Sequence, residues 1–408
     1  MRGAAGGANL LALRSHNTAL VLDLLRTAGG AGISRLELAE RTGLTPQAVS
    51  KITARLRGEG LAAEAGRRAS TGGKPRTVLR LVPGAGHALG VHLDRDELRA
   101  VLVDLDGTVV AERRAPLDLG AGAETVLEGV ARAAEDLAAK GLGHLVVESA
   151  RVPGAALAAA PTLLGLGVAL PGPLDHVRGV LHRITGFPGW DGYPLREALE
   201  RRLGVPVVVD KDTNAAALGL AVGGAGAEEG SKAGGEGGSG AGVEAAGAGA
   251  RGGSFAYLHL GTGLGAGLVF GGGVHRGART GAGEFGHQVV QLDGPSCTCG
   301  ARGCIEALCL AAVARGDLAE AARVLGTGAA NLAGLLDIDL VLLGGRTVAA
   351  APEAFVHGVG AVLDARARRE GGHDGAVPVR LAPGGTRGVA EGAAQLLLAP
   401  LFGRGEGG

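Results

Sequence analysis

One short stretch of this sequence contains three of its four cysteines and a histidine. The run Gly281–His287 ends in a histidine, and Cys297, Cys299 and Cys304 follow soon after. One imidazole and three thiolates make four ligands, the number that a closed tetrahedral zinc site needs. The glycines between Cys299 and Cys304 let the chain turn tightly, so the thiolates can converge. We therefore predict a structural zinc site formed by His287 and the three cysteines, with unligated buried cysteines as the alternative.

The fourth cysteine is expected to be structural, and the apolar segments indicate the cellular compartment. Cys309 lies in an apolar stretch and is expected to be a core residue. Arg14 and His16 interrupt the Leu-rich start of the chain, so it does not resemble a signal peptide. No segment reaches membrane-spanning length without a charge or a Gly or Pro break. We therefore expect a cytoplasmic protein with no membrane partner, a setting in which clustered cysteines favour a metal site over disulfides.

The stretch from Gly281 to Glu306 also resembles the signature of the ROK family, which groups bacterial sugar kinases with sugar-responsive repressors. Further segments match the family in the same order along the chain: Gly165–Asp175, Gly189–Trp190 with Pro194–Leu195, and Asp210–Leu218. The resemblance implies an actin-like, two-lobed ATPase fold with a sugar bound in the cleft between the lobes. It covers most of the chain and lacks a counterpart only for a Gly-rich segment at residues 222–253.

The resemblance also implies which residues contact a sugar. Asp212 stands where the kinases of the family keep the catalytic base that accepts a proton from the attacking sugar hydroxyl. Glu284, His287 and Glu306 stand where sugar hydroxyls are bound, and His287 also matches a zinc ligand. The alternative for these carboxylates is ordinary surface charge.

Two positions on the sugar side depart from the family pattern. Lys211 replaces the Asn that usually precedes the catalytic Asp, and Gly186 stands where many members have Asn. Both positions normally touch sugar in the family. The choice of sugar is therefore open at this point, and so is whether any sugar binds.

The phosphate side of the cleft departs further. Kinases of this fold have a strand that ends in Asp and then a Gly-Gly-Thr turn, whereas this chain has Gly90–Glu97. His92 replaces the metal-associated Asp, and Asp94 and Asp96 would repel a phosphate beside the turn. A second Gly-rich loop, Gly261–Gly267, also suits the turns of the fold without a nucleotide. We therefore expect no kinase activity and no ATP cofactor.

The first 82 residues have a different character from the rest of the chain. They carry thirteen Lys or Arg and five Asp or Glu, a net charge of +8, although the whole chain is neutral. Capping residues and apolar spacing predict three helices beginning near residues 17, 34 and 45, then strands at 61–64 and 77–81. This order is typical of a winged helix-turn-helix, and its basic surplus favours an anionic partner.

The third predicted helix would be the recognition helix of this unit. Val49, Ile52 and Leu56 share its buried face, so its exposed N-terminal residues would meet base edges in the major groove. The basic loop between the strands could follow the DNA backbone or reach the minor groove. We predict DNA contacts from Gln47, Ser50, Lys51, Arg55, Arg67, Arg68, Lys74 and Arg76. A small helical dimerisation domain is the alternative.

From residue 88 onward, strands alternate with helices, which is typical of an α/β fold. We expect residues 1–82 to form the winged helix-turn-helix and residues 83–408 to form a ROK sugar-kinase-like domain. Residues 222–253 contain fourteen glycines and no aromatic residue, so we predict a flexible surface insertion there.

Taken together, these features predict a DNA-binding transcriptional regulator, in the simplest case a repressor of carbohydrate genes. Its ROK domain would sense a small sugar or sugar-phosphate effector, and a homodimer or homotetramer would bind a double-stranded DNA operator. Two alternatives stay open. One is an active ATP-dependent sugar kinase with a regulatory DNA-binding domain, and the other is a ligand-independent DNA-binding protein whose sugar pocket has decayed.

Overall fold

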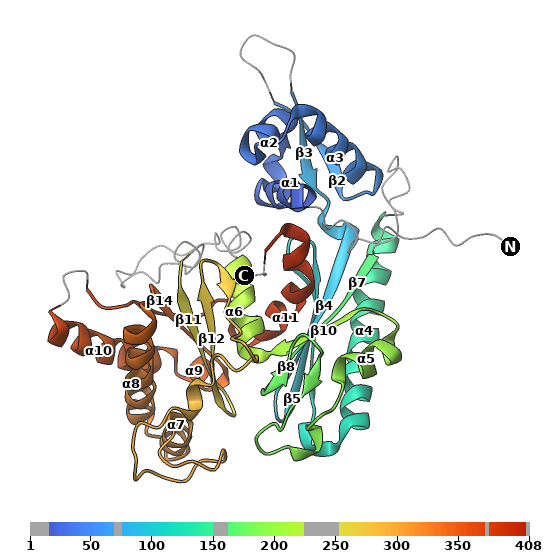
Figure 1. Ribbon diagram of the computed structural model, residues 1–408. Coiled ribbons are helices and arrows are strands. Elements are labelled where there is room, and N and C mark those ends of the chain that lie inside the picture. Colours follow the sequence, from blue (N-terminus) through green and yellow to red (C-terminus); the bar gives the residue numbers. More distant parts are fainter. Residues whose placement is uncertain (1–15, 69–75, 150–161, 224–252, 372–374, 405–408) are drawn as a thin grey trace, which may run out of the picture.

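The computed structural model describes residues 16–68, 76–149, 162–223, 253–371 and 375–404 (Figure 1). Lys74 and almost all of the predicted insertion at 222–253 lie outside these ranges. Within them, the chain forms a three-stranded sheet, two five-stranded sheets and a two-stranded sheet. None of the helices in this part of the chain is both long enough and apolar enough to cross a membrane.

The first unit is a three-helix bundle with a small antiparallel sheet of order β1-β3-β2. Its elements are α1 (His16–Thr27), β1 (Ile33–Ser34), α2 (Arg35–Thr42), α3 (Pro46–Gly58), β2 (Ala62–Arg68) and β3 (Arg76–Leu81). The predicted caps are confirmed: Ser34 and Glu37 form a capping box at α2, and the Thr45 hydroxyl accepts the amide of Ala48 at α3. The strands are longer than predicted, and β1 was not expected. This arrangement is a winged helix.

The first lobe is built on a mixed sheet of order β10-β7-β4-β5-β6. The strands are β4 (Gly86–Leu93), β5 (Glu97–Asp104), β6 (Val109–Pro116), β7 (Thr162–Leu170) and β10 (Val207–Lys211). Helices α4 (Ala123–Ser149) and α5 (Leu195–Leu203) cover one face, and α11 (Gly388–Leu398) packs against the other. A short hairpin, β8 (Leu174–Asp175) and β9 (Val180–Leu181), follows β7.

The second lobe is built on a sheet of order β13-β12-β11-β14-β15. The strands are β11 (Phe255–Leu260), β12 (Leu264–Phe270), β13 (Gly273–Val274), β14 (Leu340–Gly344) and β15 (Val379–Leu381). One face packs on α7 (Ile305–Ala314), α8 (Leu318–Leu336) and α10 (Pro352–Glu370), with the short α9 (Arg346–Ala350) after β14. The other face packs on α6 (Asp212–Val222) and α11.

Two helices, α6 and α11, therefore lie between the sheets of the two lobes (Figure 1). Side chains alternate along β11 accordingly: Ala256 and Leu258 face the outer helices, whereas Phe255 and Tyr257 face α6 and α11. This is the two-lobed, actin-like architecture that the sequence predicted. It brings the carboxyl end of β10 and the β4–β5 turn opposite the β11–β12 turn, where the cleft lies.

Candidate functional site

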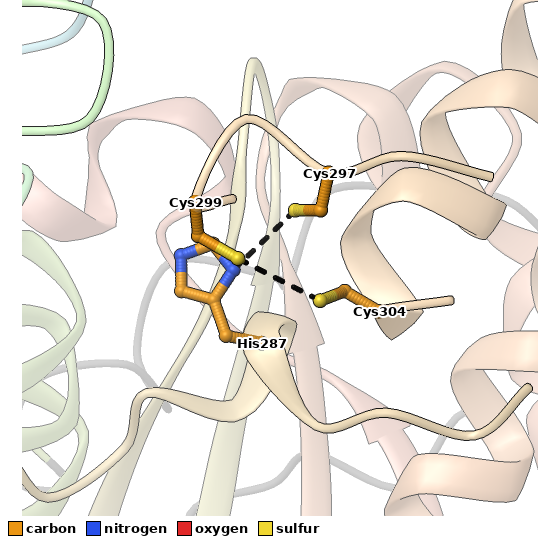
Figure 2. A group of neighbouring side chains, drawn as sticks. All are labelled: His287, Cys297, Cys299 and Cys304. Atoms are coloured by element: carbon orange, nitrogen blue, oxygen red, sulfur yellow. Dashed lines mark hydrogen bonds between the residues drawn. The ribbon is translucent and has the colours of Figure 1, made fainter. Parts of the chain in front are cut away.

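His287, Cys297, Cys299 and Cys304 converge just before α7 (Figure 2). Their ligand atoms all lie within 4.8 Å of one another. The Cys297 sulfur is 3.7 Å from Nδ1 of His287, and the Cys299 and Cys304 sulfurs are 3.7 Å apart. Two sulfurs bound at about 2.3 Å to one tetrahedral ion would lie about 3.8 Å apart. The four side chains therefore have the spacing of a metal site.

Local backbone geometry explains this convergence. An isolated bridge between Ser296 and Arg302 closes the loop that carries Cys297 and Cys299. Gly303 has φ of 68°, and a Cβ there would collide with the carbonyl oxygen of Gln291. A short 3-10 helix, Phe285–His287, holds His287 opposite the loop. Cys309 stays apart, because its fully buried thiol faces the carbonyl of Ala321.

A cleft between the lobes is lined by Asp212, Glu284, His287 and Glu306. Asp212 and Glu306 lie in the first turns of α6 and α7. An Asp212 oxygen accepts the Thr213 amide at 2.7 Å, and a Glu306 oxygen accepts the Leu264 amide at 2.8 Å. Both carboxylates are thus held in fixed orientations by backbone amides. The structure brings these four sequence-predicted residues around one cleft, with His287 shared by the metal cluster.

Lys211 also lines this cleft, but its side chain is almost fully buried. Its side chain is 3% exposed, and its ammonium donates to the carbonyl of Ala282 and to Glu284 Oε1, the latter at 3.1 Å. A Cβ on Gly172 would lie 2.7 Å from Lys211 Cδ, so this glycine leaves room for the lysine chain. Lys211 therefore fixes Glu284 by an ion pair instead of standing free toward a ligand.

Arg95 fills the space beside the other departure from the family pattern. Gly186 has φ of 89°, and a Cβ there would lie 3.4 Å from Nη1 of Arg95. The same guanidinium lies 5.6 Å from the ring centroid of Phe187 and lines the cleft. A cationic side chain thus lies where many family members have an amide.

On the phosphate side, Arg346 bridges the lobes. This first residue of α9 donates to Asp94 at 2.7 Å and to Asp96 at 3.0 Å, both on the β4–β5 turn. Thr262, on the β11–β12 turn, donates to Asp94 at 2.6 Å. Burial of Asp94 opposes its ionisation, yet the hydrogen bond from Thr262, the nearby His92 and Arg346 together lower its pKa to about 2.

This bridge corrects one step of the sequence argument. Asp94 and Asp96 were treated as free carboxylates that would repel a phosphate, but both are paired with the Arg346 guanidinium. The two carboxylates therefore share one guanidinium, and Asp94, Gly345 and Arg346 line a second pocket beside the turn. An ion pair with Arg346, rather than two bare carboxylates, distinguishes this turn.

Two histidines lie behind the bridge. His92, at the end of β4, is 6% exposed, and burial lowers its pKa to about 4, so its imidazole is neutral near pH 7. Its ring meets the edge of His259 with centroids 6.1 Å apart, and Nδ1 of His259 lies 2.9 Å from the hydroxyl of Tyr257. A neutral imidazole therefore stands where the family's kinases have a carboxylate.

On the winged helix, Gln47, Ser50 and Lys51 are exposed on α3. Val49, Thr53 and Leu56 are its buried residues, so Thr53 takes an inward position while Ile52 is only half-buried. The Thr53 hydroxyl bonds the Val49 carbonyl at 2.8 Å, which satisfies it inside the core.

The predicted basic contacts divide into three groups. Arg55 is exposed on α3, and it donates a hydrogen bond to Thr18 of α1 at 2.6 Å, which connects the two helices. Arg68 of β2 pairs with Arg76 of β3, and Arg67 directly precedes Arg68 on β2. Arg76 is exposed, and Lys74 lies outside the described residues. Arg67, Arg68 and Arg76 thus lie where the described parts of β2 and β3 end and begin.

Sequence reasoning missed the bridging residues Arg346 and Thr262 and the role of Arg95. Arg346 directly follows Gly344-Gly345, which did attract notice, and Thr262 lies within the Gly-rich loop. No local pattern signals that Arg346 pairs with Asp96, because 250 positions separate them.

The fold and the cleft together define a sugar-kinase-like, two-lobed protein with a winged helix at one end. Residues 88–253 and 239–315 match the sequence profile of the ROK family, and the chain belongs to that family. The xylose repressor of Bacillus subtilis (strain 168) is 26% identical over 274 residues, which cover 67% of this chain and 61% of the repressor. NagC of Escherichia coli (strain K12), a DNA-binding transcriptional dual regulator, is 28% identical over 306 residues, 75% of this chain and 65% of NagC. The chain thus spans less than two thirds of these relatives.

Two solved structures bear on the fold. A ROK family transcriptional regulator, described as a homolog of the E. coli MLC protein, superposes with a TM-score of 0.67 and 19% identity. The match covers 95% of this chain and 97% of that one, so the winged helix and both lobes share its fold. The ROK hexokinase from Thermus thermophilus gives a TM-score of 0.53 and 29% identity, over 76% of this chain and 96% of the hexokinase.

Proposed function

We propose that this protein is a DNA-binding transcriptional regulator, a repressor of carbohydrate genes, whose ROK domain binds a sugar or sugar derivative. One observation carries the proposal: a cleft lined by Asp212, Glu284, His287 and Glu306 lies in the same chain as a winged helix. The similarity to the xylose repressor and to NagC supports it. The exposed polar face of α3 and the net charge of +8 on residues 1–82 support the DNA contact.

The carboxylates of the cleft suit a polyhydroxylated ligand. A carboxylate has two oxygens, so Glu306 can hold the Leu264 amide with one and accept a ligand hydroxyl with the other. Asp212 can do the same beyond the Thr213 amide. Since Lys211 occupies one oxygen of Glu284, the ligand would meet the other oxygen or compete with the ammonium. We assign sugar contacts to Asp212, Glu284, His287 and Glu306.

The cysteine cluster suits zinc. Three thiolates and one imidazole at tetrahedral spacing are a ligand set that zinc prefers. With four protein ligands the ion has no open position, so it would stabilise the loop and would not activate a substrate. Because His287 belongs to both the cluster and the cleft wall, the metal would also hold that wall in place.

Phosphoryl transfer is not part of the proposed function. Arg346 and the neutral His92 lie on the phosphate side of the cleft, where the family's kinases use glycine amides and a carboxylate. Asp212 then serves as a sugar contact rather than as a base. The second candidate, an active kinase, is favoured by Asp212 itself and by the similarity to the Thermus hexokinase.

The regulator would act in the cytoplasm on duplex DNA. Winged helix-turn-helix proteins bind paired half-sites as symmetric oligomers, so we propose a homodimer or homotetramer. Gln47, Ser50 and Lys51 would meet base edges, while Arg55, Arg67, Arg68, Lys74 and Arg76 would contact the backbone or minor groove.

The test measures operator binding and ATP consumption on one preparation. DNA from upstream of the gene is titrated with protein alone and with saturating xylose, N-acetylglucosamine or glucose. We expect DNA binding that weakens as salt rises, a change in affinity with at least one sugar, and no sugar-dependent ADP formation. Phosphorylation of any sugar would establish the kinase instead. Sugar-insensitive DNA binding, with no sugar bound by calorimetry, would establish the ligand-independent alternative.

A further inference from the structure

The winged helix and the first lobe share one hydrophobic core. Leu22 and Leu25 of α1 belong to the same buried cluster as Val101 of β5 and Leu401 and Phe402. The last two lie in η8 (Ala399–Phe402), a 3-10 helix that continues directly from α11. In Figure 1 the winged helix stands directly beyond the end of α11. The winged helix is therefore packed on η8 and the first lobe, so we expect a displacement of η8 to displace the winged helix as well.

Charged contacts fix this junction. Arg404 donates to both oxygens of Asp23 on α1, at 2.7 and 3.0 Å. Asp23 also accepts from Arg26 at 3.2 Å, and the Arg26 guanidinium lies 4.2 Å from the ring centroid of Phe402. The Arg26 side chain is only 5% exposed. Burying a guanidinium costs free energy unless it is paired. The contacts with Asp23, Phe402 and Arg404 therefore favour one position of α1 relative to η8.

The other end of this connection lies at the cleft. Helix α6 begins at Asp212 and packs along α11. A Cβ on Gly392 of α11 would collide with the carbonyl of Ala215, and a Cβ on Gly219 would lie 3.0 Å from the Cα of Gly392. The two helices therefore touch through their backbones. Because no flexible side chain separates them, a shift of α6 must be shared by α11.

We propose that Phe402 and Arg404 are positioning residues that couple the cleft to the DNA-binding unit. A sugar held by Asp212 displaces α6, α11 moves with it, and η8 carries that movement to α1 through Arg404–Asp23 and Phe402–Arg26. The inference rests on the proposed function, since it needs both a sugar at Asp212 and DNA at α3. It assigns to these residues a share in the response to sugar and no share in binding either ligand.

The test uses Arg404→Ala in the full chain, with Arg404→Lys as the conservative variant and Arg323→Ala as the control. Arg323 forms an exposed ion pair with Glu320 on α8, far from the junction. Sugar affinity is measured by calorimetry with xylose, N-acetylglucosamine and glucose. Operator affinity is measured without sugar and at saturating sugar. Hydrogen exchange of residues 16–27 reports on α1 directly.

In the wild type, coupling typical of allosteric proteins would change operator affinity by about 5- to 150-fold. Arg404→Ala should bind sugar as the wild type does and lose most of that change, while sugar ceases to alter hydrogen exchange in α1. Arg404→Lys should restore part of the response, and Arg323→Ala should retain all of it. A full response in Arg404→Ala, with α1 exchange still sugar-dependent, would overturn the coupling role. A wild type that binds no sugar, or ignores a bound one, would refute the proposed function itself and the coupling with it.

Discussion

Arg346→Ala removes the side chain that joins Asp94 and Asp96 to the second lobe. The contacts of Asp94 lower its pKa from an ordinary value of 3.8 to about 2. Each pKa unit corresponds to about 1.4 kcal/mol, so these contacts favour the folded state by roughly 2 kcal/mol near neutral pH. The Asp94 side chain is 15% exposed but that of Arg346 is 39% exposed, so solvent screens part of their interaction. Without Arg346 the buried carboxylate keeps its desolvation penalty and loses a charged donor, but the hydrogen bonds from Thr262 and the Arg95 amide remain, so we expect a loss of roughly 1 kcal/mol.

The pH dependence has a defined sign. The folded pKa of Asp94 lies below the unfolded pKa, so the stabilisation is fully present above about pH 4 and is lost as pH falls toward about 2. The difference in unfolding free energy between wild type and Arg346→Ala should therefore be constant from pH 8 to pH 5. It should narrow below pH 4, where Asp94 takes up a proton in both proteins.

Urea unfolding at a series of pH values measures this difference. Arg323→Ala is the matched control, because its ion pair with Glu320 is 64% exposed on the arginine side and should contribute under about 1 kcal/mol. Loss of the proposed zinc in acid would affect all three proteins equally and would cancel. If Arg346→Ala had the same free energy of unfolding as the wild type at pH 7, the Arg346 ion pairs would not contribute to stability. A difference that persisted unchanged at pH 3 would show that it does not arise from Asp94.

Three further outcomes test the proposed sites. Gln47→Ala/Lys51→Ala should weaken operator binding at least about tenfold in an anisotropy titration, and unchanged affinity would show that α3 does not read the DNA. Elemental analysis should find one zinc per chain, and Cys304→Ser should lower the free energy of unfolding by several kcal/mol, because metal-binding energy is folding energy; a metal content near zero would exclude the site. Glu284→Ala and Glu306→Ala should each abolish the sugar response without changing sugar-free DNA affinity, whereas a response that survived both would place the sugar elsewhere.

Features encoded by neighbouring residues could be predicted from the sequence. The capping side chains of Ser34 and Thr45 mark helix starts that the structure reproduces. The spacing of Cys297, Cys299 and Cys304 indicated the metal cluster because the glycines between Cys299 and Cys304 permit a tight loop. These interactions involve only residues close in sequence, so they form independently of the rest of the fold.

Features that depend on contacts across the fold could not be predicted. Helix α11 is buried on nearly all sides between two sheets. It therefore lacks the alternation of polar and apolar faces, with a period of about 3.6 residues, by which a helix is recognised in a sequence. Thr53 also faces the core, beside the half-buried Ile52, and its hydroxyl donates to the Val49 carbonyl; apolar spacing gives no sign of a buried threonine. The Arg346 bridge exists only once the two lobes have met.

The two sides of the cleft support the proposal of sugar binding without phosphoryl transfer. On the sugar side, Asp212 and Glu306 are each anchored to a backbone amide at a helix start, so they are oriented before a ligand arrives and binding loses little side-chain entropy. On the phosphate side, Arg346 and Thr262 already link the lobes without a nucleotide. A sugar entering such a cleft needs no phosphate donor to complete the contacts between the lobes. In the proposed sensor, the binding energy of the sugar would then be available to shift α6 and α11.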